Sequence, residues 1–143
     1  TRLANDTTLN SHDRVRAAES LAGVAGFEQA GADLLTRLAD DTTLDSHARV
    51  RAAASLAGMD SFGRARMDSF WQARAAGMRQ VGVNLLTRLA DDTTLNAHAR
   101  LDAAESLAGV AGFERAGADL LTRLANDTTL NSHARAHAAE YLT

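Results

Sequence analysis

The chain has 143 residues, a hydrophobic content of 45% and a formal net charge of −3. This composition is typical of a folded globular protein, and the length calls for no second domain. The absence of cysteine excludes disulfides and thiolate sites, and the acidic balance provides no overall positive potential to attract a nucleic acid.

No apolar run approaches the ~20 residues that a membrane-spanning helix needs, and no charged-then-apolar signal sequence opens the chain. We therefore expect a soluble protein of the cytoplasm. The first residue is Thr1, in the middle of a repeating pattern, which indicates a fragment or a processed chain.

A block of 35 residues recurs from one end to the other. Repeat 1 covers residues 1–35, repeat 2 covers 36–86 with an insertion at 59–74, repeat 3 covers 87–121, and a partial repeat 4 covers 122–143. Repeats 1 and 3 differ only at positions 5, 11, 13, 15, 16 and 29, so 29 of their 35 residues are identical. A period of this length indicates stacked supersecondary units, and we predict one domain over residues 1–143.

Apolar spacing predicts two helices in each repeat. In repeat 1, Val15, Ala18 and Leu21 share one face of the first helix, and Leu34 and Leu38 share one face of the second. Over the whole chain this pattern predicts an all-α fold without strands, with seven main helices centred near residues 17, 33, 51, 84, 103, 119 and 137.

Capping residues and glycines recur at fixed places in these predicted helices. An Asx residue opens each first helix, where its side chain can accept a bond from a backbone N–H: Asn10, Asp45, Asn96 and Asn131. Gly23 and Gly26 are expected to end the first helix and turn the chain. Another glycine lies inside each second helix, at a cost of about 1 kcal/mol relative to alanine: Gly31, Gly82 and Gly117. These glycines predict close helix contact, although a relic of duplication would also explain them.

Polar residues that recur in every repeat are candidates for chemistry. Histidines occur once per repeat: His12, His47, His98 and His133. Equivalent helices lie about 8–10 Å apart whereas zinc needs its nitrogens within about 2.1 Å, so we interpret them as surface or inter-repeat hydrogen-bonding groups. His137, one turn after His133, varies between repeats and is interpreted as exposed. We expect no enzyme, no catalytic residue, no metal and no cofactor.

Three positions vary along one flank of the first helix, and a second polar set does not vary. Position 13 reads Asp13, Ala48, Ala99, Ala134; position 16 reads Arg16, Arg51, Asp102, His137; position 19 reads Glu19, Ala54, Glu105, Glu140. This flank is either a binding stripe or a drifting solvated face, and the solvated face is favoured. The constant set consists of one aspartate and one arginine in every repeat: Asp6, Asp41, Asp92 and Asp127, together with Arg14, Arg49, Arg100 and Arg135.

The repeat resembles the HEAT and HEAT-like family. The resemblance rests on the Asx cap, on Arg14 and Val15 at the entry to the first helix, on the alanine-rich body, and on the stretch from Leu34 to Ala39 before Asp40. It implies a right-handed α-solenoid of stacked antiparallel helix hairpins, with an Asp–Arg ladder along the inter-helix turns. The sequence departs from the family at Ser11 and in the long 7–9 connection.

The insertion, Met59 to Arg74, is a tandem octamer, MDSFGRAR followed by MDSFWQAR. It holds three of the six aromatic residues, and Asp60-Ser61 and Asp68-Ser69 are helix-opening signals that predict one or two further helical turns. Because Trp, Phe and Arg often anchor interfaces, we predict that six side chains bind a partner: Phe62, Arg64, Arg66, Phe70, Trp71 and Arg74. The alternative is that the segment only packs on the repeats.

The favoured function is a protein–protein interaction module, part of a larger regulatory protein. A nucleic-acid-binding domain and an artificial consensus scaffold are the alternatives. We also expect a concentration-dependent homodimer, formed through the insertion or through the chain ends.

Overall fold

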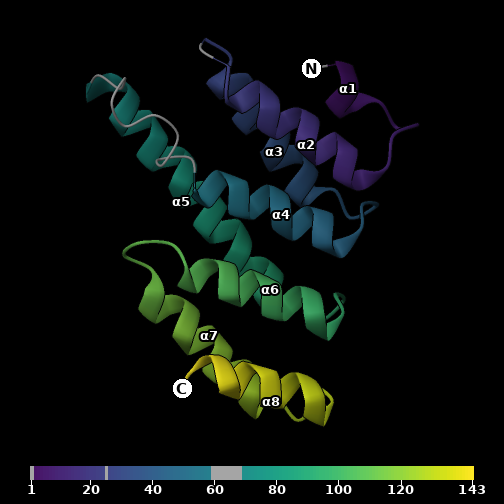
Figure 1. Ribbon diagram of the computed structural model, residues 1–143, viewed down its shortest axis with the longest axis vertical. Helices are drawn as coiled ribbons and strands as arrows, with labels where there is room; N and C mark the ends of the chain where they lie inside the picture. The colour runs from purple at the N-terminus through teal and green to yellow at the C-terminus, as the bar shows by residue number, and fades with distance from the viewer. Residues whose placement is uncertain (1, 25, 59–68) are drawn as a thin grey trace. The chain divides into compact units, whose positions relative to one another are not determined.

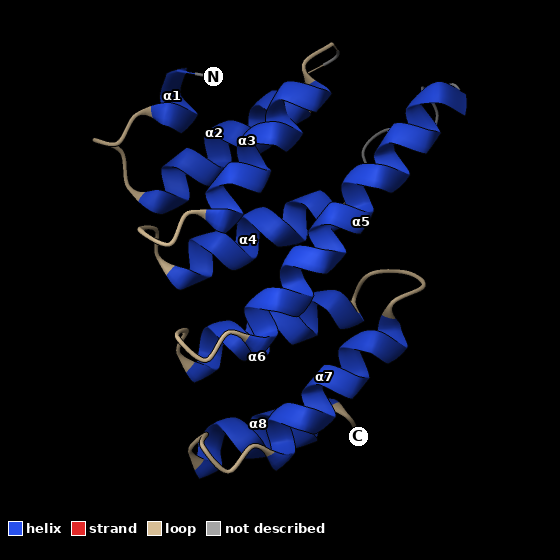
Figure 2. Cartoon of the chain, turned by 180° about the vertical axis from the view of Figure 1, so that it is seen from behind, coloured by secondary structure: helices blue, strands red, loops and turns tan. Residues whose placement is uncertain are grey.

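All regular secondary structure in the described residues, 2–24, 26–58 and 69–143, is α-helical in the computed structural model (Figures 1 and 2). The helices are α1 (Arg2–Asn5), α2 (Ser11–Ala22), α3 (Glu28–Asp40), α4 (Ser46–Ala57), α5 (Ser69–Asp91), α6 (Ala97–Ala108), α7 (Glu114–Asn126) and α8 (Ser132–Tyr141). The predicted all-α class and the seven main helices are confirmed for these residues. We call α2, α4, α6 and α8 first-type helices and α3, α5 and α7 second-type helices, after their order in the repeat. The short α1 aligns with the last residues of the second-type helices.

The chain divides into two compact units, Thr1–Leu85 and Leu86–Thr143. In the first unit, α3 packs against both α2 and α4, and the two first-type helices α2 and α4 also touch. In the second unit, α7 packs against both α6 and α8, and α6 touches α8. Each unit therefore repeats the same neighbour relations between consecutive helices.

The predicted caps are present at every first-type helix. The side-chain oxygen of Asn10 accepts a hydrogen bond from the Asp13 backbone N–H at 2.9 Å, and the other three Asx residues accept equivalent bonds at the starts of α4, α6 and α8. At the other end of α2, the chain turns through Gly26, whose φ is +87°. Gly112 has the same φ before α7. This left-handed conformation strains any residue that carries a Cβ.

Leucine and valine fill the core at most of the predicted positions, although Leu21 of the predicted apolar face is only half-buried. The largest fully buried side chains are Val15, Leu34, Leu35, Leu56, Leu86, Leu101, Leu107 and Leu121. The pair Leu34-Leu35 recurs as Leu85-Leu86 and Leu120-Leu121, and all six are buried. The apolar face assigned to the second-type helix is therefore confirmed.

The mid-helix glycines lie where two helices of a hairpin meet. A Cβ on Gly31 would lie 2.4 Å from the Cα of Ala22, one on Gly82 would lie 2.3 Å from the backbone nitrogen of Ala57, and one on Gly117 would lie 2.3 Å from that of Ala108. Real atoms do not approach so closely. The predicted close contact is confirmed, and glycine is required because its partner at this point is backbone.

Helix α5 differs from its counterparts because it begins earlier. The counterparts α3 and α7 begin at Glu28 and Glu114, which align with Arg79 of α5, so residues 69–78 extend the helix by about 15 Å. The extension begins at Ser69, which belongs to the predicted helix-opening signal Asp68-Ser69, and Gly77, which aligns with Gly26, is helical. Further helical turns in the insertion are thus confirmed for residues 69–74, while residues 59–68 lie outside the description.

A change of sequence accompanies the longer helix. In repeats 1 and 3, the glutamate that opens the second helix accepts a hydrogen bond from the turn glycine, Glu28 Oε2 from the Gly26 N–H at 2.8 Å and Glu114 Oε2 from the Gly112 N–H at 2.9 Å. Arginine stands at this position in α5, as Arg79. An arginine cannot accept that bond, and inside a continuous helix no acceptor is needed.

Candidate functional site

The constant aspartates shape the loop between repeats. Oδ1 of Asp6, Asp41, Asp92 and Asp127 accepts two bonds from the threonine two residues later, at 2.9 Å from its N–H and 2.6 Å from its hydroxyl. These bonds lower the pKa of Asp41, and the charges of Arg14 and Arg49 lower it further. The pKa of Asp6 and that of Asp127 are lowered by the same threonine bonds. The aspartate is therefore a loop-forming group.

The constant arginines join each first helix to the end of the helix that precedes it. Nε of Arg49 donates to the Ala39 carbonyl at 2.9 Å, and Nε of Arg100 donates to the Ala90 carbonyl at 2.9 Å. Arg14 and Arg135 make the same bond to Ala4 and Ala125. Arg49 and Arg100 are buried although they are charged. Each arginine thus satisfies a carbonyl near the end of a second-type helix.

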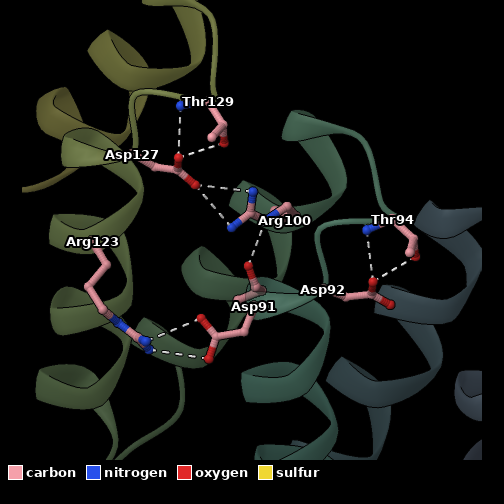
Figure 3. Close-up of polar contacts among 8 residues, drawn as sticks. Asp91, Asp92, Thr94, Arg100, Arg123, Asp127 and Thr129 are labelled. Atoms are coloured by element: carbon pink, nitrogen blue, oxygen red, sulfur yellow. Dashed lines mark hydrogen bonds and ion pairs between the residues drawn. The ribbon is translucent and has the colours of Figure 1, made fainter.

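One contact of the expected Asp–Arg ladder is seen, in the second unit. Both terminal nitrogens of Arg100, in repeat 3, donate to Oδ2 of Asp127, in repeat 4, at 3.4 Å (Figure 3). Figure 3 also shows Arg123 paired with Asp91, whose closest atoms are 3.3 Å apart on an exposed surface. These side chains bond each other, and Arg100 also bonds a backbone carbonyl. We therefore interpret them as structural groups.

Two of the variable positions pair between repeats. Glu19, at position 19 of repeat 1, accepts hydrogen bonds from Arg51, at position 16 of repeat 2, at 3.0 Å and 2.8 Å, and from the Ser55 hydroxyl at 2.5 Å. Burial of Glu19 raises its pKa, but the bonds from Arg51 and Ser55 outweigh burial and the pKa is lowered. The interpretation of this flank as a freely drifting solvated face is wrong here, because the two positions vary as partners.

The same two positions pair again in the second unit. Glu105, at position 19 of repeat 3, lies with Oε1 3.3 Å from Nδ1 of His137, at position 16 of repeat 4. Tyr141 stands where Ser55 bonds Glu19, and the buried Oε1 of Glu105 accepts no hydrogen bond from the described residues. His137 is half-exposed, as predicted, but it has a specific acidic partner.

The repeated histidines are exposed in all four repeats, in agreement with their interpretation as surface groups. His12 Nε2 lies 3.7 Å from Asp45 Oδ2 of the next repeat, and the rings of His98 and His133 meet edge-on with centroids 6.4 Å apart. No group of three or more His, Asp or Glu side chains among the described residues is arranged to hold a metal ion.

A cavity of about 270 Å³ lies between α3 and the early part of α5 and is the candidate site. We call it the α3–α5 groove. Its lining combines an apolar floor with polar side chains on both helices: Gln29, Ala32, Asp33 and Thr36 from α3, Leu56 from α4, and Arg74, Gly77, Met78 and Val81 from α5. All of these residues belong to the first unit.

The groove coincides with the departure of repeat 2 from its template. Val81 stands where repeats 1 and 3 have Ala30 and Ala116, and it is 40% exposed although it is a large apolar residue. Met78 replaces the phenylalanine of the other repeats and is buried, whereas Phe27 is 53% exposed. Comparison of the second helices alone would have identified these two substitutions, but not the groove that they line.

The predicted partner-binding residues fall in three places. Phe62, Arg64 and Arg66 lie outside the described residues. Phe70 and Trp71 are in the extension of α5, and their side chains are not described. Arg74 is exposed and lines the groove. The sequence interpretation missed the α3 wall of the groove, namely Gln29 and Asp33, because the variation at position 29 gives no sign that α3 faces the extended α5.

The groove therefore combines an exposed apolar side chain, a buried apolar floor and a polar rim. No family model, curated protein or solved structure matches this chain. Within the described residues, no helix is both long and apolar enough to cross a membrane.

Proposed function

We propose that this chain is a non-catalytic, protein-binding module built from HEAT-like repeats, and that it holds its partner in the α3–α5 groove. The observation that carries the proposal is Val81, a large apolar side chain that is 40% exposed and lines the cavity where repeat 2 departs from its template. The fully buried Leu56 and the buried Met78 form an apolar floor beside it.

The size of the groove favours a protein side chain as its occupant. At about 270 Å³ it lies below the range of roughly 300–1,000 Å³ that is common for small-molecule sites. Interfaces place an apolar anchor in a desolvated pocket and surround it with polar groups. On α3, Gln29 and Asp33 form such a rim and already bond each other at 2.8 Å, so the rim is ordered before binding.

The assignment to HEAT-like repeats is supported by local features. Antiparallel helix pairs recur every 35 residues outside the insertion, an Asx cap opens each first helix, and buried arginines donate to carbonyls near the end of the preceding second helix. In such arrays the repeated scaffold positions a surface, and function depends on residues that depart from the repeat.

The test compares Val81→Asp with Ala116→Asp, its matched control at the corresponding exposed position of α7. Proteins captured from cells that express the chain are compared among the parent and the two variants, and each captured candidate is then purified for calorimetric titration. We expect a direct partner that binds the parent and the control alike and loses about tenfold or more in affinity to Val81→Asp. Equal affinity for all three chains would exclude the groove.

The nucleic-acid alternative is tested in parallel. A fluorescent single-stranded oligonucleotide is titrated with the parent chain at two salt concentrations. Binding that weakens steeply with salt, together with no purified protein partner, would replace the proposed function by nucleic-acid recognition.

A further inference from the structure

Near-identical repeats must pack in the correct order during folding. Repeats 1 and 3 share 29 of 35 residues, because six positions differ. Their capping residues, core leucines and contact glycines are therefore interchangeable. Neighbouring units that resemble each other so closely can pair out of turn, within a chain or between chains, and such misassembly is characteristic of repeat proteins.

We propose that positions 16 and 19 of the repeat form an electrostatic register code, which determines which repeat can pack after which. In each unit a carboxylate at position 19 meets a basic side chain at position 16 of the next repeat. The pairs are Glu19 with Arg51, at 2.8 Å, and Glu105 with His137, at 3.3 Å. This inference stands independently of the α3–α5 groove, which uses neither position.

The attractive part of the code is built with more than one bond. Glu19 accepts two bonds from the guanidinium of Arg51 and a third from the Ser55 hydroxyl, and only 23% of its side chain is exposed. A bidentate, partly desolvated pair of this kind is more specific than an exposed ion pair, because the carboxylate loses water that only a correctly placed cation replaces.

The repulsive part of the code lies in the two residues that break the pattern. Repeat 2 has Ala54 at position 19, and repeat 3 has Asp102 at position 16. If repeat 3 packed directly after repeat 1, the carboxylate of Asp102 would take the place of the Arg51 guanidinium against Glu19. Asp102 would face the same repulsion if repeat 3 packed after repeat 3 of a second chain, where it would meet Glu105. Alanine at position 19 carries no charge that would repel Asp102, and repeat 2 is the only repeat in the sequence with alanine at this position.

The charges at positions 16 and 19 thus select the neighbouring repeat both by repulsion and by attraction. Repeats 1 and 3 each carry a glutamate at position 19, and each of these glutamates would repel Asp102. Repeat 3 is thereby kept from following repeat 1 or another repeat 3, and the order 1, 2, 3, 4 retains the Glu19–Arg51 pair in the first unit and the Glu105–His137 pair in the second.

The test removes the code while leaving the core unchanged. The double variant Ala54→Glu/Asp102→Arg gives every repeat a glutamate at position 19 and all repeats after the first a basic residue at position 16. The full chain is refolded from urea over a range of protein concentrations, and native mass spectrometry and size-exclusion chromatography measure the fraction recovered as the parent species. We expect the misassembled or dimeric fraction to rise about two- to fivefold.

Two further chains make the outcome decisive. Ala54→Ser/Asp102→Glu changes the same sites but keeps the charge pattern, and it should refold like the parent. A third chain inverts the sign of every charged residue at positions 16 and 19 and therefore keeps the logic of the code, so it should also refold like the parent. Its substitutions are Arg16→Glu, Glu19→Arg, Arg51→Glu, Asp102→Arg, Glu105→Arg, His137→Glu and Glu140→Arg. Equal misassembly in the parent and in Ala54→Glu/Asp102→Arg, or misassembly in all variants alike, overturns the proposal.

Discussion

Glycine at position 31 of the repeat is determined by a backbone contact. A Cβ on Gly31 would lie 2.4 Å from both the backbone nitrogen and the Cα of Ala22, atoms that cannot move without displacing α2. Gly77 is also helical, but a Cβ there meets no described atom within 4 Å. Two glycines in helices of the same unit are thus expected to respond oppositely to the same substitution.

We predict that Gly31→Ala lowers the free energy of unfolding by about 1–3 kcal/mol, since overpacking at a close contact exceeds the gain in helix propensity. Gly77→Ala should raise it by up to about 1 kcal/mol, because alanine is the better helix former. Urea denaturation followed by circular dichroism measures both. A stabilising Gly31→Ala would show that α2 and α3 do not meet as closely as the structure indicates.

Glu19 makes the stability of the first unit dependent on pH. Burial raises its pKa, but bonds from Arg51 and Ser55 leave the pKa below its usual value of 4.5. The folded state therefore binds its proton less tightly than the unfolded state does. The stabilisation is complete above about pH 4.5 and is lost as the pH falls through the lowered pKa.

We therefore expect Glu19→Gln to be less stable than the parent near neutral pH and the difference to disappear on acidification. Urea unfolding midpoints of both chains between about pH 3 and pH 7 give the comparison. Glu140→Gln is the control, since Glu140 occupies the same repeat position and is exposed. A gap that stays constant across the range would mean that the Glu19–Arg51 pair does not stabilise the fold.

At the scale of the helix, the second-type element carries the core. Leu35 of α3 and its counterparts Leu86 and Leu121 are fully buried, and α3 packs against both α2 and α4. A single truncation at this position therefore removes apolar contact in the middle of the first unit.

We predict that Leu35→Ala costs about 2–5 kcal/mol of unfolding free energy, from lost apolar burial and from the cavity that remains. Leu3→Ala is a suitable control, because Leu3 lies in the short α1 and is 60% exposed. Thermal and urea denaturation measure both changes. A loss under about half a kcal/mol for Leu35→Ala would contradict the assigned core face.

For the whole molecule, we predict that the insertion determines where α5 of repeat 2 begins. In repeats 1 and 3 the chain passes through Gly26 and Gly112, each with φ of +87°, before the second helix begins. In repeat 2 the aligned Gly77 lies inside α5. Deletion of residues 59–74 restores the 35-residue spacing, and we expect it to restore the glycine turn as well.

The test of this expectation is that the effect of Gly77→Ala on the free energy of unfolding should reverse its sign. In the full-length chain Gly77→Ala should stabilise, as argued above. In the chain without residues 59–74, Gly77 should adopt positive φ, and Gly77→Ala should cost about 1–2 kcal/mol. Denaturation of the four chains gives the two differences. The same sign in both backgrounds would show that the longer α5 does not depend on the insertion. Light scattering on the two glycine-containing chains also tests the predicted homodimer.

Much of the local structure follows from the sequence by itself. Repetition determines the number of helices, their order and their approximate centres, because each repeat carries the same apolar spacing and the same caps. Asn10 and its counterparts cap helices since their side chains need only the next three residues of backbone to do so. The contact role of Gly31 could also be predicted, because a repeated cost implies a repeated close approach.

The tertiary structure alone decided which distant residues meet. Glu19 and Arg51 lie 32 residues apart, and sequence alone showed two varying positions without showing that they vary as partners. The α3–α5 groove likewise required α3, α4 and the extended α5 to be placed together. Local signals act within a few residues along the chain, whereas pairing and cavities depend on packing between helices, which periodicity does not specify.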